Sequence, residues 1–153
     1  MSTNSYILKE NKNGTYTGIY CHWDGYFEKN GVLLVKYYKD RKKVEKLISL
    51  GTLNRLERNI DPNPALEHSY SNPQKDVCFF LKRDWGRDDW DEDPTTYSKE
   101  DLKELIEFGN YVYVYTLENK WVYLDFEDNN RFFDLEDKII QLIKEGRIWN
   151  EKD

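Results

Sequence analysis

Alternation of apolar and polar residues predicts two β-hairpins in this chain. The first spans residues 5–21 and turns at residues 11–14, where Asn13-Gly14 supplies the positive φ of a tight turn. The second spans residues 111–126 and turns at residues 118–120. Because side chains alternate between the faces of a strand, this second hairpin has one aliphatic and one aromatic face. We expect the aliphatic face to contact the core; it comprises Val112, Val114, Val122, Leu124 and Phe126, and the aromatic face comprises Tyr111, Tyr113, Tyr115, Trp121 and Tyr123.

Apolar residues at helical spacing predict helices in four places. The predicted helices span residues 31–38, 41–50, 98–109 and 134–146. Ser98 and Asp134 are suitable N-caps for the last two. We also expect one further helical turn within residues 52–60.

The middle of the chain predicts a loop, a strand and a second loop. Residues 61–74 contain three of the four prolines and predict a loop. Residues 76–82 are apolar on both faces and predict a central strand. Residues 83–97 predict an acidic surface loop that contains two tryptophans. The whole pattern predicts a single α+β domain over residues 1–153, an antiparallel sheet of about five strands with roughly three to four helices, mainly on one face.

The composition supports a folded core despite a modest apolar fraction. Apolar residues make up 39% of the chain, but aromatic residues make up 16%, and each buried aromatic side chain removes about 150–250 Å² from water. The net charge of -6 disfavours direct nucleic-acid binding and suits a partner with a basic surface. Cys21 and Cys78 lie in apolar segments outside any CxxC pair, so we expect buried thiols and no zinc site. With no apolar run long enough for a signal peptide or a membrane span, we expect a cytoplasmic protein without membrane contact.

The segment Ile19-Tyr20-Cys21-His22-Trp23-Asp24-Gly25-Tyr26 concentrates reactive and aromatic side chains. It predicts a site at the end of a strand, with His22 as acid or base and Asp24 orienting it. Trp23 or Tyr26 would stack on a planar ligand. Neighbouring strand residues point to opposite faces, so Cys21 and His22 are not expected to form a nucleophile–base pair. The alternative is a strand that ends in an Asp-Gly turn, with Trp23 packed into the core.

His68, in the proline-rich loop, is the other histidine of the chain. If this loop folds back on the Asp24 turn, His22 and His68 flank one space. They would then act as base and acid on a phosphodiester, or bind a metal together with Asp24 or Glu67. Tyr70 would be a further ligand-binding residue. The alternative is a solvated or capping His68, and we expect no metal and no other cofactor.

The acidic loop is a candidate partner-binding surface. Its carboxylates would imitate a nucleic-acid backbone on a basic, nucleic-acid-binding surface of a host protein, with tryptophans as anchors. The predicted contact residues are Trp85, Asp88, Asp89, Trp90, Asp91, Glu92 and Asp93. The alternatives are a solvated loop and a cation site, although the acidic residues lack EF-hand spacing.

The aromatic face of the second hairpin allows three interpretations. It would stack on bases, although its acidic surroundings disfavour this. It would form the interface of a homo-oligomer, or it would be covered by a helix. The sequence contains no GxGxxG, P-loop, GxSxG or HExxH motif, which disfavours the common nucleotide-hydrolysing machineries.

Three blocks of the sequence resemble a family of small proteins encoded by phages, prophages and their bacterial hosts. The blocks are IYCHWDGY with the following LLVKYY and KVEKLISLG, then HSYSNPQKDV at residues 68–77, then YVYVYTLENKWVY at residues 111–123. Phe27 stands where the relatives tend to carry proline. The resemblance implies a phage accessory protein and brings no particular activity with it.

This context and the acidic loop lead to the main functional expectation. We expect a non-enzymatic accessory protein that binds and inhibits a host defence component, such as a CRISPR effector. The alternative is a protein that binds or cleaves a nucleotide at the IYCHWDGY segment. A structural oligomerisation domain is the second alternative.

Overall fold

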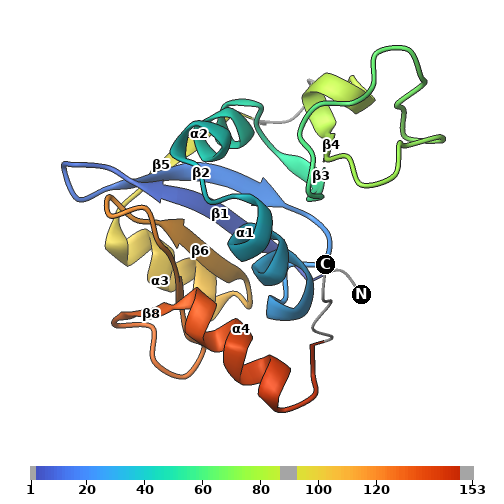
Figure 1. Ribbon diagram of the computed structural model, residues 1–153. Helices are drawn as coiled ribbons and strands as arrows, with labels where there is room; N and C mark the ends of the chain where they lie inside the picture. The colour runs from blue at the N-terminus through green and yellow to red at the C-terminus, as the bar shows by residue number, and fades with distance from the viewer. Residues whose placement is uncertain (1–2, 87–92, 149–153) are drawn as a thin grey trace.

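A computed structural model describes residues 3–86 and 93–148 of the chain (Figure 1). These residues form one α+β domain around a mixed sheet of eight strands, in the order β4-β3-β2-β1-β6-β7-β8, with β5 paired to β2. The strands are β1 (Ser5–Glu10), β2 (Tyr16–Cys21), β3 (Leu53–Arg55), β4 (Phe79–Phe80), β5 (Thr95–Tyr97), β6 (Tyr111–Tyr115), β7 (Trp121–Leu124) and β8 (Phe132–Asp134).

Both predicted hairpins are confirmed, but the sheet is not antiparallel throughout. β1 pairs antiparallel with β2, and β6 pairs antiparallel with β7. Between the two hairpins, however, β1 pairs parallel with β6, and β2 pairs parallel with β3. Parallel neighbours need a long crossover, and helices between β2 and β3 supply one. The short strands β3, β5 and β8 were not predicted, because three residues give too little alternation to recognise.

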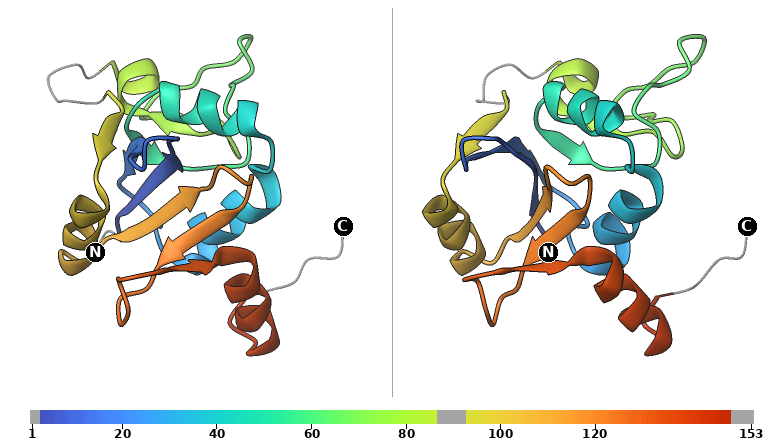
Figure 2. Two further views of the ribbon diagram at one scale, coloured as in Figure 1. Left: turned by 90° about the vertical axis from the view of Figure 1, so that its left-hand side faces the viewer. Right: turned by 60° about the vertical axis from the view of Figure 1, so that its left-hand side comes forward.

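In the described part of the chain, four α-helices cover both faces of the sheet (Figure 2). They are α1 (Val32–Tyr37), which follows the π-helical turn η1 (Phe27–Gly31), then α2 (Arg41–Ser49), α3 (Lys99–Glu107) and α4 (Leu135–Lys144). Side chains of α1, α2 and α4 pack into the larger core cluster, and α3 packs into a second cluster on the other face. The predicted caps are confirmed, since Ser98 and Asp134 each accept a hydrogen bond from the first helical turn. No helix in the described ranges is long and apolar enough to cross a membrane.

The aromatic face of the second hairpin forms the larger core. Tyr113 and Tyr115 are fully buried, and Trp121 is only 6% exposed. Their polar atoms donate hydrogen bonds to backbone carbonyls, Tyr113 to Gly25 at 2.6 Å and Trp121 to Tyr38 at 2.8 Å. This burial rules out base stacking or oligomerisation through the face and confirms the interpretation that helices cover it.

The aliphatic face of the same hairpin packs under α3 through Val112, Val114 and Leu124. Phe126 was expected on this core face but is 45% exposed, because it lies beyond the end of β7. It instead packs against the Tyr111 ring in a T-shaped arrangement with centroids 4.9 Å apart.

The middle of the chain differs most from expectation. Residues 52–60 form β3 and an irregular segment instead of a helical turn. The predicted central strand over residues 76–82 is reduced to β4 at one end of the sheet. Its two-sided burial comes from the larger core on one side and from the loop over residues 61–74 on the other, where Phe79 packs against His68. The segment 83–97, expected as a loop, begins inside a second π-helical turn, η2 (Leu81–Trp85), and ends with β5.

Cys21 and Cys78 are both buried free thiols, as the sequence predicts. Burial raises the pKa of Cys21 to about 12 and also raises the pKa of Cys78. Because the thiolate is the reactive form, we expect neither cysteine to react with iodoacetamide at neutral pH in the folded protein. Mass spectrometry should detect no adduct without denaturant and two adducts in urea. Rapid alkylation of either thiol in the folded protein would contradict the placement of these residues.

Candidate functional site

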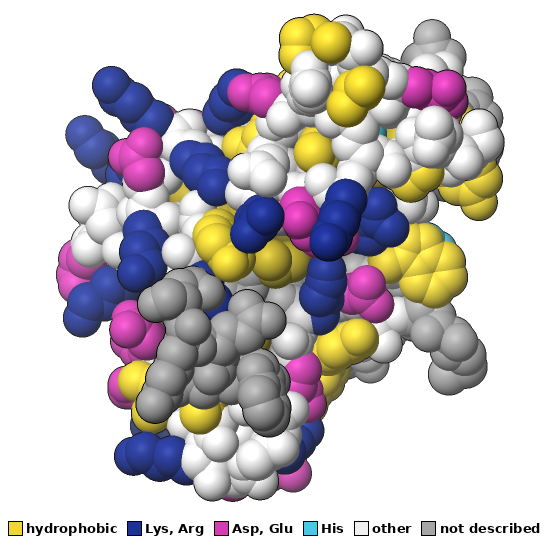
Figure 3. Space-filling model, turned by 45° about the vertical axis from the view of Figure 1, so that its right-hand side comes forward, with side chains coloured by type: hydrophobic (Ala, Val, Ile, Leu, Met, Phe, Trp, Pro, Cys, Tyr) yellow, Lys and Arg dark blue, Asp and Glu magenta, His cyan; other side chains and the backbone are white. Residues whose placement is uncertain are grey.

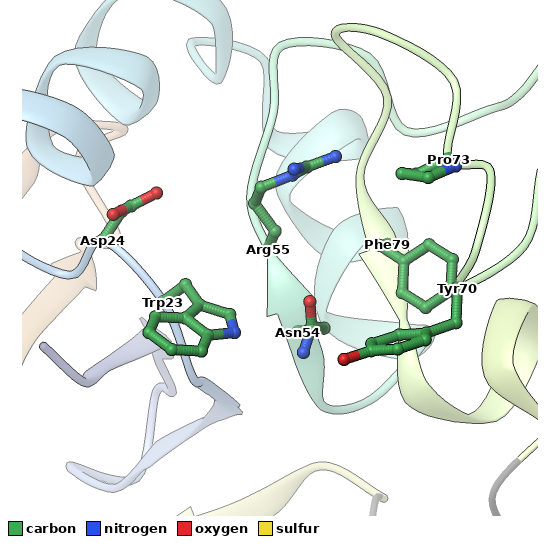
Figure 4. A pocket seen from close by; sticks show the side chains of 7 residues that line it. All are labelled: Trp23, Asp24, Asn54, Arg55, Tyr70, Pro73 and Phe79. Carbon is green, nitrogen blue, oxygen red and sulfur yellow. The ribbon is translucent and has the colours of Figure 1, made fainter. Parts of the chain in front are cut away.

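Two adjoining cavities open where β2 ends beside β3. The large chamber has a volume of about 450 Å³ and the small chamber about 210 Å³. Trp23, Asn54 and Tyr70 line both, so we treat the two chambers as one aromatic groove (Figure 4). The large chamber is also lined by Asp24, Arg55, Pro73 and Phe79, and the small chamber by Tyr20, His22, Thr52, Leu81 and Trp85.

The first wall of the aromatic groove is Trp23, which is 41% exposed. The backbone N–H of Trp23 donates to the carbonyl of Asn54 at 3.1 Å, which ties the end of the IYCHWDGY segment to β3. The turn that follows is tightly held: a Cβ on Gly25 would lie 2.7 Å from the backbone of Asn4, so only glycine fits there. The segment is therefore a strand end, but the interpretation that packs Trp23 into the core is wrong.

The second wall is a pair of stacked rings from distant parts of the chain. Tyr70 from the proline-rich loop stacks on Trp85 of η2, with centroids 4.1 Å apart and an interplanar angle of 11°. Phe79 of β4 meets both rings edge-on. Tyr70 remains 59% exposed, so this wall presents an open aromatic face to the groove. Figure 4 shows Trp23 and Tyr70 on opposite sides of Asn54.

His68 holds this second wall in place and lines neither chamber. Its side chain is 4% exposed. Its Nδ1 accepts the backbone N–H of Gln74 at 2.9 Å, so its Nε2 carries the proton and donates to the carbonyl of Cys78 at 3.0 Å. Both ring nitrogens are thus engaged in fixing the loop. His68 is neither solvated nor available as the acid–base partner of His22.

His22 and Asp24 lie in different chambers. His22 Nδ1 is 3.4 Å from the hydroxyl of Tyr20, and the imidazole packs edge-on against Trp23 at 4.7 Å. Asp24 accepts a hydrogen bond from the hydroxyl of Tyr26 at 3.4 Å, and no hydrogen bond in the described part of the chain joins it to His22. Tyr26 is exposed and lines neither chamber. Residues 3–86 and 93–148 contain no group of three side chains suited to hold a metal ion.

The different roles of the two histidines predict different costs of substitution. His68→Ala removes a buried ring that packs on Phe79 and leaves the part-buried N–H of Gln74 without its acceptor, so it should lower the free energy of unfolding by about 1–3 kcal/mol. His22→Ala breaks a long contact to Tyr20 and the ring contact with the half-exposed Trp23, so it should cost less than about 1 kcal/mol. Urea titrations followed by circular dichroism compare the two variants. Equal losses would contradict the role assigned to His68.

The acidic segment is only partly described. Asp88, Asp89, Trp90, Asp91 and Glu92 lie outside the described residues. Trp85 belongs to the aromatic groove, and Asp93 is exposed and pairs with Lys82 at 3.4 Å. Asp84 is buried beneath the surface, where its carboxylate accepts the backbone N–H of Phe80 at 2.8 Å.

Asn54 and Arg55 are groove residues that the sequence did not indicate. They lie within residues 52–60, where the predicted helical turn is wrong and β3 forms instead. The pairing of β3 with β4 shifts register between Leu53 and Arg55, and such a bulge re-aims side chains. Both Asn54 and Arg55 consequently line the large chamber, although strand neighbours ordinarily point to opposite faces.

Comparison of the chain with models of known protein families, with curated proteins and with solved structures found no match. The resemblance to phage-encoded proteins therefore stays a prediction.

Proposed function

We propose that the protein binds a small molecule carrying a nucleobase in the aromatic groove, and that it sequesters this ligand without turnover. The observation that supports the proposal is an amide, Asn54, between two exposed aromatic walls, Trp23 and the Tyr70–Trp85 stack. Neither amide atom of the Asn54 side chain has a hydrogen bond within the described residues. The site thus offers stacking surfaces together with a donor and an acceptor that are not used by the fold.

Each part of this arrangement suits a nucleobase. Stacking a base on an aromatic side chain contributes about 1–3 kcal/mol. An asparagine amide presents one acceptor beside two donors, and it can bond two neighbouring atoms on the edge of a base. The small chamber adds apolar contacts from Leu81 and Trp85 around the same space.

A free small molecule fits the surface better than a nucleic-acid strand does. Charged side chains of both signs are interspersed over the face shown in Figure 3, where hydrophobic side chains reach the surface near histidine. Strand-binding proteins use a positively charged groove to follow the phosphate backbone. The net charge of -6 disfavours binding of a nucleic-acid strand, because it repels the phosphate backbone.

Sequestration is favoured over cleavage by the placement of the titratable groups. His22 is the candidate acid or base of the small chamber, and His68, its expected partner, is engaged in the loop. Acid–base chemistry on a phosphodiester calls for both a proton acceptor and a proton donor. In the context implied by the phage resemblance, such a protein would withdraw a nucleotide signal from a host defence system.

Inhibition of a host protein through the acidic segment stays a separate prediction. Most of its proposed contact residues fall within residues 87–92, outside the described residues. Trp85, one of its two proposed anchors, contributes to the wall of the groove instead.

Isothermal titration with adenosine, guanosine, cytidine and uridine tests the proposal. We expect saturable binding of at least one nucleoside at one molecule per chain, with the nucleoside recovered unchanged by chromatography. Absence of binding by all four would refute the nucleobase assignment. Formation of a product that requires His22 would refute sequestration without turnover.

A further inference from the structure

The large chamber is lined by a cation, Arg55, whose contact with the fold is an ion pair that lacks hydrogen-bond geometry. Arg55 Nε lies 3.2 Å from a carboxylate oxygen of Glu57, but it is buried and forms no hydrogen bond. No hydrogen bond from the Arg55 guanidinium occurs within the described residues. A guanidinium carries five N–H donors in a planar fork that matches phosphate oxygens. Figure 4 shows this side chain extending over the chamber toward Pro73.

Arg55 shares its carboxylate partner with a second cation. Glu57 also accepts hydrogen bonds from Lys29, at 3.2 and 3.3 Å to its two carboxylate oxygens. One carboxylate is therefore shared between two cations, Lys29 and Arg55, and these three side chains together carry one net positive charge. Glu57 is largely buried, so this ion pair also restrains the direction of the Arg55 side chain.

Asp24 provides an acceptor elsewhere in the same chamber. Its backbone has φ 60, and its carbonyl accepts the N–H of Asn30 at 3.2 Å, so the turn that carries it is fixed. One carboxylate oxygen receives the weak hydrogen bond from Tyr26, and this leaves acceptor capacity facing the chamber. Carboxylates in nucleotide sites accept hydrogen bonds from ribose hydroxyls. Asp24 would repel a ligand that carries only negative charge. A ribose phosphate can contact both residues, Arg55 through its phosphate and Asp24 through its hydroxyls.

We propose that the ligand of the aromatic groove is a nucleoside 5′-monophosphate, with its phosphate bound by Arg55 and its ribose hydroxyls bound by Asp24. This inference rests on the proposed nucleobase-binding function and specifies the class of ligand. The base occupies the space between Trp23 and Tyr70 that both chambers share. Sugar and phosphate extend into the large chamber, whose volume of about 450 Å³ exceeds what a base alone needs.

The test compares nucleosides with their 5′-monophosphates by isothermal titration at fixed ionic strength. In the wild-type protein the monophosphate should bind about tenfold or more tightly than the nucleoside with the same base. Arg55→Gln should remove this advantage, so that the variant binds the nucleoside and its monophosphate with similar affinity. Arg58→Gln is the matched control, because Arg58 pairs with Asp76 at 3.2 Å and lines neither chamber.

The outcomes separate the two proposals. Equal affinity for nucleoside and monophosphate would overturn the phosphate assignment while nucleobase binding stands. A monophosphate advantage that survives in Arg55→Gln would overturn the role of Arg55. Failure of both ligand classes to bind would overturn the proposed function itself. Circular dichroism of Arg55→Gln checks that the variant is folded, and Arg55→Lys, which keeps the charge without the planar fork, should retain part of the advantage.

Discussion

Replacing Trp23 by alanine should lower the affinity of the groove for its nucleoside about 5- to 150-fold. This range corresponds to the about 1–3 kcal/mol that stacking of one base on an aromatic side chain contributes. Trp23 is the wall that the IYCHWDGY segment supplies, and it lines both chambers. Titration of the nucleoside against wild type and variant measures the loss.

The stability of the same variant provides an internal check. Because Trp23 is 41% exposed, its removal leaves little cavity in the core, and the free energy of unfolding should fall by less than about 1 kcal/mol. Phe108→Ala is the control for binding, since Phe108 is an exposed aromatic residue at the end of α3 and lines neither chamber. If Trp23→Ala binds as tightly as Phe108→Ala, the stacking wall has been misassigned.

Replacing Trp121 by alanine should instead cause a large loss of stability, because Trp121 lies in the core and not in the groove. Trp121 lies in the larger core, where its indole N–H donates to the carbonyl of Tyr38 at 2.8 Å. Trp121→Ala should lower the free energy of unfolding by about 3–5 kcal/mol, through lost burial, a cavity and an unpaired carbonyl. Since domains have total stabilities of about 5–15 kcal/mol, this variant would be close to unfolding at ordinary temperature.

Urea titrations of the two variants, followed by far-ultraviolet circular dichroism, provide the comparison. A small loss of stability for Trp121→Ala, similar to that for Trp23→Ala, would mean that the aromatic face of β6 and β7 is a surface. The pair of variants thus distinguishes a tryptophan that stabilises the fold from one that contacts a ligand.

Local signals in the sequence were sufficient to predict the longer strands and helices. The alternation in β1, β2, β6 and β7 extends over enough residues to exclude helical spacing, and the caps Ser98 and Asp134 identify where α3 and α4 begin. Parallel pairing of β1 with β6 has no such signal, because it joins segments about a hundred residues apart through their backbones. The sequence left open that helices cover the aromatic face, but it did not indicate that this face forms the larger core, which is possible because tyrosine hydroxyls can be satisfied inside a core, as Tyr113 demonstrates.

The candidate site was predicted in part. The sequence indicated Trp23 and Tyr70 as ligand-binding residues and His22 as a candidate acid or base, and the structure brings all three to the small chamber. Asn54 and Arg55 were missed, because their placement depends on a bulge in a strand of three residues. His68 was considered as a catalytic residue, but the hydrogen bonds that engage it come from a loop whose path only the folded structure defines.

The measurement that tests the central claim most directly is the fluorescence of 2-aminopurine riboside titrated with the protein. The emission of this nucleoside analogue falls when its base stacks on an aromatic ring. Binding between Trp23 and Tyr70 predicts saturable quenching with the wild-type protein, strongly reduced quenching with Trp23→Ala, and full quenching with Phe108→Ala. Unchanged emission with the folded wild-type protein, or equal quenching by all three proteins, would contradict base stacking in the aromatic groove.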